Sequence, residues 1–95
     1  MTRYVTLIRF IRQGVRAIKK SLARAEAFHK ACRRAGVNVE TQLWTAGAYD
    51  GVMILSAKNE AKVLAAIAKL ASLGYVHTET LQAFDAREFA AIVGG

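Results

Sequence analysis

The chain has 95 residues, 54% of them hydrophobic, and a formal net charge of +7 at pH 7. This length suits one domain, spanning residues 1–95, and leaves no room for a second. The single cysteine, Cys32, excludes an intramolecular disulfide or a cysteine metal cluster within one chain, and the absence of proline and of low-complexity tracts disfavours disorder.

The first strand is expected over residues 3–11, which are rich in Val, Ile, Tyr and Phe. Both of its alternating faces are apolar, with Val5 and Leu7 opposite Tyr4 and Ile8. Arginines interrupt this segment, so that it forms neither a signal-peptide core nor the roughly 20 apolar residues of a membrane span. We therefore expect a cytoplasmic protein with no membrane partner.

Helical spacing begins at residue 21, after a break that Gln13 and Gly14 predict. Ser21 is expected to be the N-cap of this helix and Gly36 its C-cap. The side expected to be buried carries Leu22, Ala25, Phe28 or His29, Cys32 and Ala35.

Basic residues are concentrated in the first third of the chain. Residues 1–34 hold ten of the fourteen Lys and Arg residues and one acid, Glu26. Such a basic face attracts phosphates or another acidic partner, and it is also typical of a solvated helix surface that maintains solubility. The sequence leaves both interpretations open.

A hairpin is expected in the middle of the chain. Residues 37–45 alternate with the period of a half-buried strand, residues 46–48 are short enough for a turn, and residues 49–57 return as the partner strand. The returning strand is again apolar on both faces, with Val52 opposite Met53.

The remaining elements are a helix, a strand and a short terminal helix. Asn59 is expected to cap a helix that runs to residue 73, with an apolar stripe that includes Leu64, and Gly74 ends it. The last strand is expected over residues 75–84. Asp85 and Glu88 then form a capping box, with Asp in the place usually taken by Ser or Thr.

This order, βαββαβ plus a terminal helix, predicts an α+β ferredoxin-like sandwich. Right-handed crossovers give an antiparallel sheet with strands in the order 4-1-3-2 and both main helices on one face. The opposite face is then apolar and uncovered. Because no spare element is large enough to cover it, we expect a second copy of the chain to do so, in a homodimer or larger homo-oligomer.

Candidate ligand-binding residues lie around the predicted turn. Gly47 and Gly51 flank Tyr49 and Asp50, so that backbone can approach a ligand closely and Asp50 can accept hydrogen bonds or act as a base. A structural interpretation is that Asp50 accepts from turn amides while Tyr49 packs at the sheet edge. Trp44, beside the turn, suits a packing anchor as well as a ligand platform.

His77 and Glu79 are two residues apart in the last strand and therefore share a face. There they can share a proton, contact a ligand, pair with Arg9 or Arg12, or serve a metal, and the structural alternative is a cross-strand ion pair or a satisfied core histidine. Two ligand types are too few for a closed metal site, and no metal or cofactor is indicated. We expect strands one and three to run parallel, which separates Asp50 from His77 by about 17–20 Å, the length of a typical strand. Only a site shared between subunits would then join them.

The chain resembles the GYD-domain proteins, named for a Gly-x-Tyr-Asp motif that stands here as Gly47, Tyr49 and Asp50. The resemblance covers nearly the whole chain in four ordered segments: Tyr-Val-Thr-Leu-Ile at 4–8, Arg-Ala-Glu-Ala-Phe at 24–28, Trp-Thr-Ala-Gly-Ala-Tyr-Asp-Gly at 44–51 and Thr-Glu-Thr-Leu at 78–81. It implies a fold that pairs as a dimeric α/β barrel, and it implies no particular reaction.

Three functions fit these residues, and whether the chain is an enzyme stays open. The first is an oligomeric accessory or binding protein that holds a small apolar or aromatic ligand, with Trp44, Tyr49 and Asp50 at the mouth of the site. The second is a cofactor-independent oxygenase or isomerase that uses Asp50 or His77 as a proton acceptor, by fold analogy alone. The third, nucleic-acid binding, is favoured by the charge but lacks the aromatic residues that stack on bases.

Overall fold

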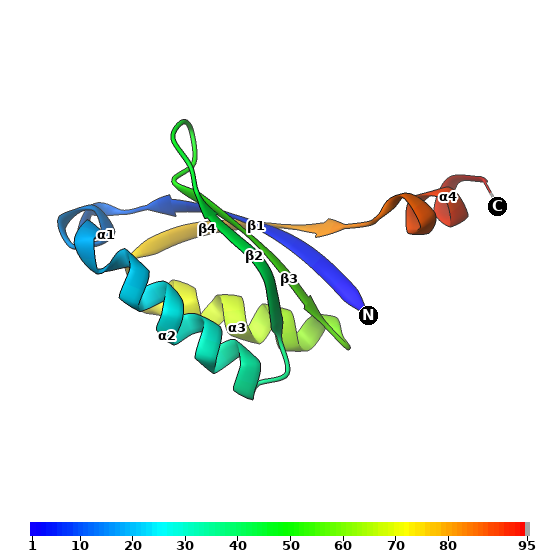
Figure 1. Cartoon of the computed structure of the whole chain (residues 1–95), viewed down its shortest axis with the longest axis horizontal. Coiled ribbons are helices and arrows are strands. Elements are labelled where there is room, and N and C mark those ends of the chain that lie inside the picture. The colour runs from blue at the N-terminus through cyan, green and yellow to red at the C-terminus, as the bar shows by residue number, and fades with distance from the viewer. Residues whose placement is uncertain (95) are drawn as a thin grey trace.

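The computed structural model describes residues 1–94, and its elements follow the expected order with one addition (Figure 1). The strands are β1 (Thr2–Phe10), β2 (Asn38–Trp44), β3 (Gly51–Ala57) and β4 (Val76–Ala83). The helices are α1 (Arg12–Arg16), the 3-10 turn η1 (Ile18–Lys20), α2 (Ser21–Arg34), α3 (Glu60–Ser72) and α4 (Ala86–Gly94). The α1–η1 segment is the addition, since the sequence predicted only a break there.

The four strands form one antiparallel sheet in the order β2-β3-β1-β4, with α2 and α3 on the same face (Figure 1). This confirms the predicted ferredoxin-like α+β fold and strand order.

The expectation that the first and third strands run parallel is wrong, because β1 pairs antiparallel with β3, with Ile8 opposite Gly51. The crossover through α2 leaves β1 and β2 running the same way, and the hairpin then reverses β3 between them. Since His77 pairs with Arg9, both Asp50 and His77 lie at the end of β1, and the predicted separation of a full strand length is wrong.

The core lies between the sheet and the two main helices. Its fully buried side chains include Met53, Leu55, Val63 and Cys32, and Thr6 in the middle of β1 shares a hydrogen bond with Thr80 of β4. The core therefore uses the face of β1 that carries Tyr4, Thr6 and Ile8.

No helix covers the opposite face of the sheet in Figure 1. This outer face carries six aliphatic side chains, which are half-buried or exposed and come from all four strands: Val5, Leu7, Leu43, Val52, Ile54 and Leu81. The predicted doubly apolar sheet is thus present in the chain.

Two local predictions of capping are confirmed. Asn59 Oδ1 accepts from the Lys62 amide at 3.1 Å. In the capping box, Asp85 Oδ1 accepts from the Glu88 amide and Glu88 Oε1 accepts from the Asp85 amide, both at 2.8 Å.

Several predicted ends and faces are wrong. β1 ends at Phe10, and Ser21 is the first residue of α2 and not its cap. Leu22 and Leu64, which were expected on buried stripes, are 70% and 47% exposed. The less exposed side of α2 instead carries Ser21, Arg24 and Phe28.

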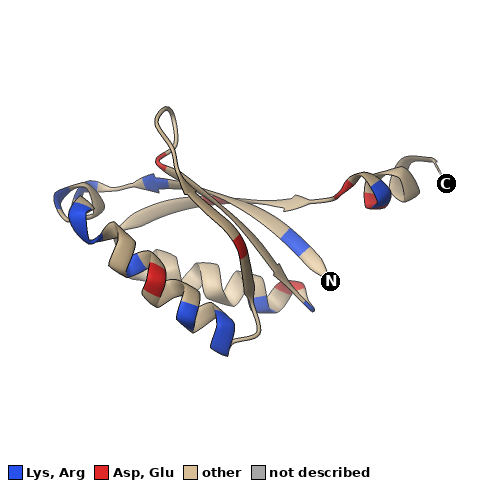
Figure 2. Cartoon of the chain, viewed as in Figure 1, with Lys and Arg blue, Asp and Glu red and all other residues tan. Residues whose placement is uncertain are grey.

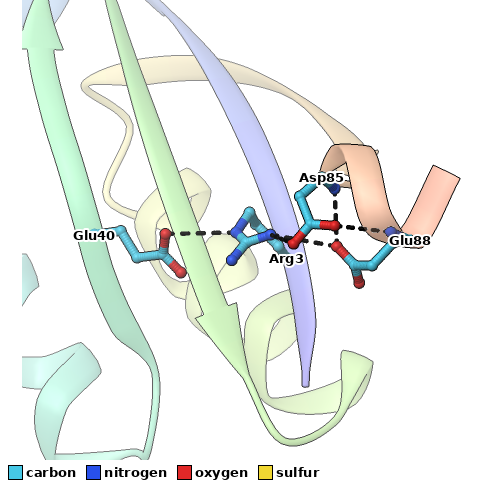
Figure 3. A network of polar contacts seen from close by, with 4 residues as sticks. All are labelled: Arg3, Glu40, Asp85 and Glu88. Carbon is cyan, nitrogen blue, oxygen red and sulfur yellow. Dashed lines mark hydrogen bonds and ion pairs between the residues drawn. The ribbon is translucent and has the colours of Figure 1, made fainter. Parts of the chain in front are cut away.

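The terminal helix α4 extends away from α2 and α3 along the long axis of the molecule (Figure 1). Figure 3 shows Arg3 of β1 between Glu40 of β2 and the capping-box residues Asp85 and Glu88. Its guanidinium lies 3.4 Å from both glutamates and 4.0 Å from Asp85. Partly exposed ion pairs of this kind contribute about 0–1 kcal/mol each, so they orient α4 more than they stabilise it. Among the described residues, no helix is long and apolar enough to span a membrane.

Candidate functional site

A pocket between the sheet and the helices opens at the end of the sheet where β1 and β2 finish. Its cavity volume is about 60 Å³, and we call it the helix-side pocket. Aromatic and aliphatic side chains form most of its wall, including Ile8, Phe10, Phe28, Trp44, Leu70 and Tyr75. Four polar residues interrupt this wall: Ser21, Arg24, Gln42 and Asp50.

Asp50 is the residue directly before β3, and it lines this pocket. Its Oδ2 accepts a 2.8 Å hydrogen bond from the Phe10 amide, and its own amide donates to Ile8 O at 2.8 Å. Thr45 fixes the other side of the turn by donating its amide to Asp50 O at 2.9 Å. Asp50 therefore joins the hairpin turn to the end of β1.

Trp44 lies at the end of β2, opposite Gly51, and its indole Nε1 donates to Ser21 Oγ at 2.9 Å. A wider hollow of about 480 Å³ continues outward from the helix-side pocket. The two spaces share Phe10, Ser21, Trp44 and Asp50. Trp44 and Phe10 thus lie between a narrower space and a wider one.

Arg24 comes from the first half of α2. Its Nη1 donates to Ala17 O at 2.9 Å, and its guanidinium carbon lies 4.5 Å from the centroid of the Tyr75 ring. Its other terminal nitrogen, Nη2, is buried and has no hydrogen-bond partner among the described residues. A permanently charged group with an unused donor therefore lines an otherwise apolar space.

A second pocket lies on the outer face of the sheet, and we call it the outer pocket. Its volume is about 200 Å³, and Arg9, Tyr49, His77 and Glu79 line it. The Tyr49 hydroxyl donates to Glu79 Oε2 at 2.7 Å, and the Arg9 guanidinium lies 5.1 Å from the Tyr49 ring centroid. The hydrogen bond to Glu79 and its negative charge raise the pKa of Tyr49.

The sequence matches the GYD domain family over residues 4–93, nearly the whole chain. The chain belongs to the GYD domain family. Two consecutive residues of the Gly-x-Tyr-Asp motif face different pockets in this GYD domain: Asp50 lines the helix-side pocket and Tyr49 lines the outer pocket.

Among solved structures, this GYD domain is similar to TTHA0845 from Thermus thermophilus, with 26% sequence identity and a TM-score of 0.59. The match covers 90% of this chain and 96% of the other. No curated protein matches the chain.

The five ligand-binding residues suggested by the sequence are thus divided between two sites. Trp44 and Asp50 line the helix-side pocket, whereas Tyr49, His77 and Glu79 line the outer pocket. The structure does not place Tyr49 at a common mouth with Trp44 and Asp50. Asp50 and His77 share one end of β1 but line different pockets, so they make no dyad within the subunit.

Sequence reasoning missed Arg24 and the aromatic residues Phe10 and Tyr75 as pocket residues. A signal for Arg24 was present, because it precedes Phe28 by four residues and so falls on the buried stripe of α2. The apolar pattern alone does not reveal Arg24, because a charged side chain interrupts the run of apolar residues on that stripe.

His29 and Cys32 are one helical turn apart in α2, a spacing that can bind a metal, but their side chains do not form a site. His29 Nε2 donates to Gln42 Oε1, and the Cys32 thiol is buried in the core. Burial raises the pKa of Cys32 to about 11. Within residues 1–94, no three His, Cys, Asp or Glu side chains gather as a metal site would require.

Proposed function

We propose that this GYD domain is the subunit of a homodimer that binds a small, largely apolar molecule in the helix-side pocket. The helix-side pocket itself is the observation that carries the proposal. Pockets for small molecules are concave and mostly apolar, with a few polar groups that fix the orientation of the ligand. Phe10, Trp44 and Tyr75 supply the apolar wall, and Arg24 and Asp50 supply two opposite charges.

The outer face of the sheet supports the dimer. Its six aliphatic side chains are contiguous over four strands, and Leu43 and Leu81 are 56% and 48% exposed on the two edge strands. A second sheet packed face to face would remove this surface from water.

The terminal helix α4 gives independent support for an assembly. It has only nine residues and exposes Phe89, Ile92 and Val93. Isolated helices shorter than about 12–15 residues are marginal in water, so packing against another surface has to supply most of its stability. A second subunit offers that surface.

The two other functions gain less from the geometry. In an oxygenase or isomerase that uses Asp50 as its base, proton transfer to the carboxylate would compete with the hydrogen bond that Asp50 accepts from the Phe10 amide. For nucleic acid, Figure 2 shows Lys and Arg along α1 and α2, but α2 lies on the helix side of the sheet. The outer face carries aliphatic residues such as Val5 and Val52, with the ring of Tyr49 in the outer pocket, instead of an array of stacking rings.

Native mass spectrometry of gently purified protein tests both parts of the proposal, because it reports the number of subunits and any retained small molecule together. We expect a dimer, or a larger assembly of dimers, that carries a defined additional mass. A monomer would overturn the dimer. A dimer that neither retains nor takes up any small molecule from a metabolite mixture would overturn the binding function.

A matched pair of variants locates the interface. Leu81→Glu places a charge on the outer face, whereas Leu64→Glu places the same charge on α3 at nearly equal exposure, 48% against 47%. In light scattering after size exclusion, we expect Leu81→Glu to yield monomer and Leu64→Glu to remain a dimer. The opposite pattern would place the interface on the helices.

A further inference from the structure

We infer that the molecule in the helix-side pocket is a monocarboxylate with an apolar body, and that its carboxylate pairs with Arg24. This inference rests on the proposed function and specifies the chemistry of its ligand. It starts from the incomplete hydrogen bonding of one guanidinium group.

Arg24 is held in place but is not satisfied. Ala17 O accepts from Nη1 at 2.9 Å and the Tyr75 ring lies against the guanidinium, which together fix its plane. Nη2 is buried without a partner, and no carboxylate of residues 1–94 lies within ion-pair distance of Arg24. Leaving a buried charged donor unpaired is costly, so a ligand that supplies an acceptor gains affinity there.

The neighbouring groups restrict the acceptor to a single negative charge. Asp50 lines the same pocket and carries its own negative charge, which disfavours a phosphate or a dicarboxylate. The guanidinium fork matches the planar geometry of a carboxylate. Ser21 Oγ accepts from the Trp44 indole, so its own hydrogen is available to donate to a second ligand oxygen.

The two connected spaces indicate how such a ligand lies. The helix-side pocket, at about 60 Å³, has room for roughly four water-sized groups, at about 10–15 Å³ each. The wider hollow beyond Phe10 and Trp44 holds about 480 Å³ and is lined by Ile18 and Leu22, with Lys19 as its cation. Because Nη2 of Arg24 is buried without a partner whereas Lys19 is exposed to water, the carboxylate lies inside, near Arg24, and an aromatic or aliphatic body passes Trp44 toward the hollow.

Trp44 provides the reporter for a test, since it is the single tryptophan of the chain and lines both spaces. The probes are 3-phenylpropanoate and its neutral amide, 3-phenylpropanamide, which share the same apolar body. We expect both to change Trp44 fluorescence at pH 7, and the acid to bind about ten-fold more tightly, because one charge-assisted hydrogen bond is worth about that factor.

Arg24→Met should abolish the preference for the acid while keeping a side chain of similar length against Tyr75. Arg33→Met, on the exposed side of the same helix, removes an equal charge and should leave the preference intact. Arg24→Lys keeps the charge without the planar fork and should give an intermediate preference, which provides a second test if the methionine variant fails to fold.

The outcomes separate the two proposals. Equal affinities for the acid and the amide would overturn the carboxylate inference and leave the apolar pocket as a binding site. Preference for the acid that persists in both Arg24 variants would also overturn it. If neither probe changes the fluorescence of Trp44 or the NMR signal of any backbone amide in the pocket, the carboxylate inference is overturned. The binding function itself is decided separately by mass spectrometry.

Discussion

The carboxylate of Asp50 closes the end of β1, because its Oδ2 accepts a 2.8 Å hydrogen bond from the amide of Phe10. Strand pairing with β3 ends two residues earlier, at Ile8 opposite Gly51, so the Asp50 side chain replaces a partner that β3 no longer provides. Asp50 is therefore a structural residue of the GYD motif as well as a wall of the helix-side pocket.

Asp50→Ala should lower the free energy of unfolding by about 1–3 kcal/mol, because the Phe10 amide loses a charged acceptor in a partly buried position. Asp50→Asn keeps an acceptor oxygen and should cost less. Urea denaturation followed by circular dichroism measures both. Glu26→Ala on the exposed side of α2 is the control and should stay within about 0.5 kcal/mol of the parent. If Asp50→Ala cost no more than this control, the capping role would be wrong.

The hydrogen bond from Tyr49 to Glu79 predicts an altered titration. In the folded chain, that bond and the Glu79 charge raise the pKa of Tyr49 above its ordinary value of 10.0. Glu79→Gln should therefore lower this pKa, as measured by NMR of ring-labelled tyrosine. Because the folded-state pKa is the higher one, the pair stabilises the fold below pH 10.0 and this stabilisation is lost as the pH rises through the raised pKa. An unchanged Tyr49 titration in Glu79→Gln would contradict the contact.

The helix caps that the sequence predicted depend on contacts over three residues. Asn59 caps the amide of Lys62 and Asp85 caps that of Glu88, so both caps are visible as short patterns. Ser21 fits the same pattern and yet is no cap, because its backbone is already helical, with φ −58° and ψ −40°, and follows directly on the turn η1. A preceding turn that the sequence did not predict thus overrides the local preference.

The division of the site into two pockets depended on direction and register, which short patterns do not contain. His77 and Glu79 were placed on one face correctly, since residues two apart in a strand always share a face. Whether Asp50 lies beside them depends on β3 running antiparallel to β1 and on the turn that directs Asp50 inward while Tyr49 stays outside. Only the three-dimensional pairing determines these relations.

The burial of Cys32 predicts that its thiol is protected from reagents in water. It is 1% exposed, and burial raises its pKa from 9.0 to about 11, so at pH 8 both access and thiolate formation are suppressed. A colorimetric thiol reagent should react with no cysteine in the native protein and with one per chain in denaturant. Because the folded-state pKa is raised, the fold should lose stability between about pH 9 and 11. Cys32→Ala should lack this part of the pH dependence, and rapid native reaction would show that Cys32 is accessible.

The close approach of Gly14 to Tyr75 provides a test of α1, a segment that the sequence did not predict. A Cβ added there would lie 2.1 Å from the backbone oxygen of Tyr75, which also accepts from the Ile11 amide at 3.1 Å. Gly14→Ala must therefore force α1 away from the start of β4, and we expect a loss of about 1–3 kcal/mol in the free energy of unfolding.

Because Tyr75 packs against Arg24, the same change should weaken binding of 3-phenylpropanoate to the helix-side pocket. Gly94→Ala is the matched control, since nothing lies within 4 Å of its added Cβ, and it should leave both stability and binding unchanged. Equal behaviour of the two variants in urea denaturation would show that α1 does not pack closely against Tyr75.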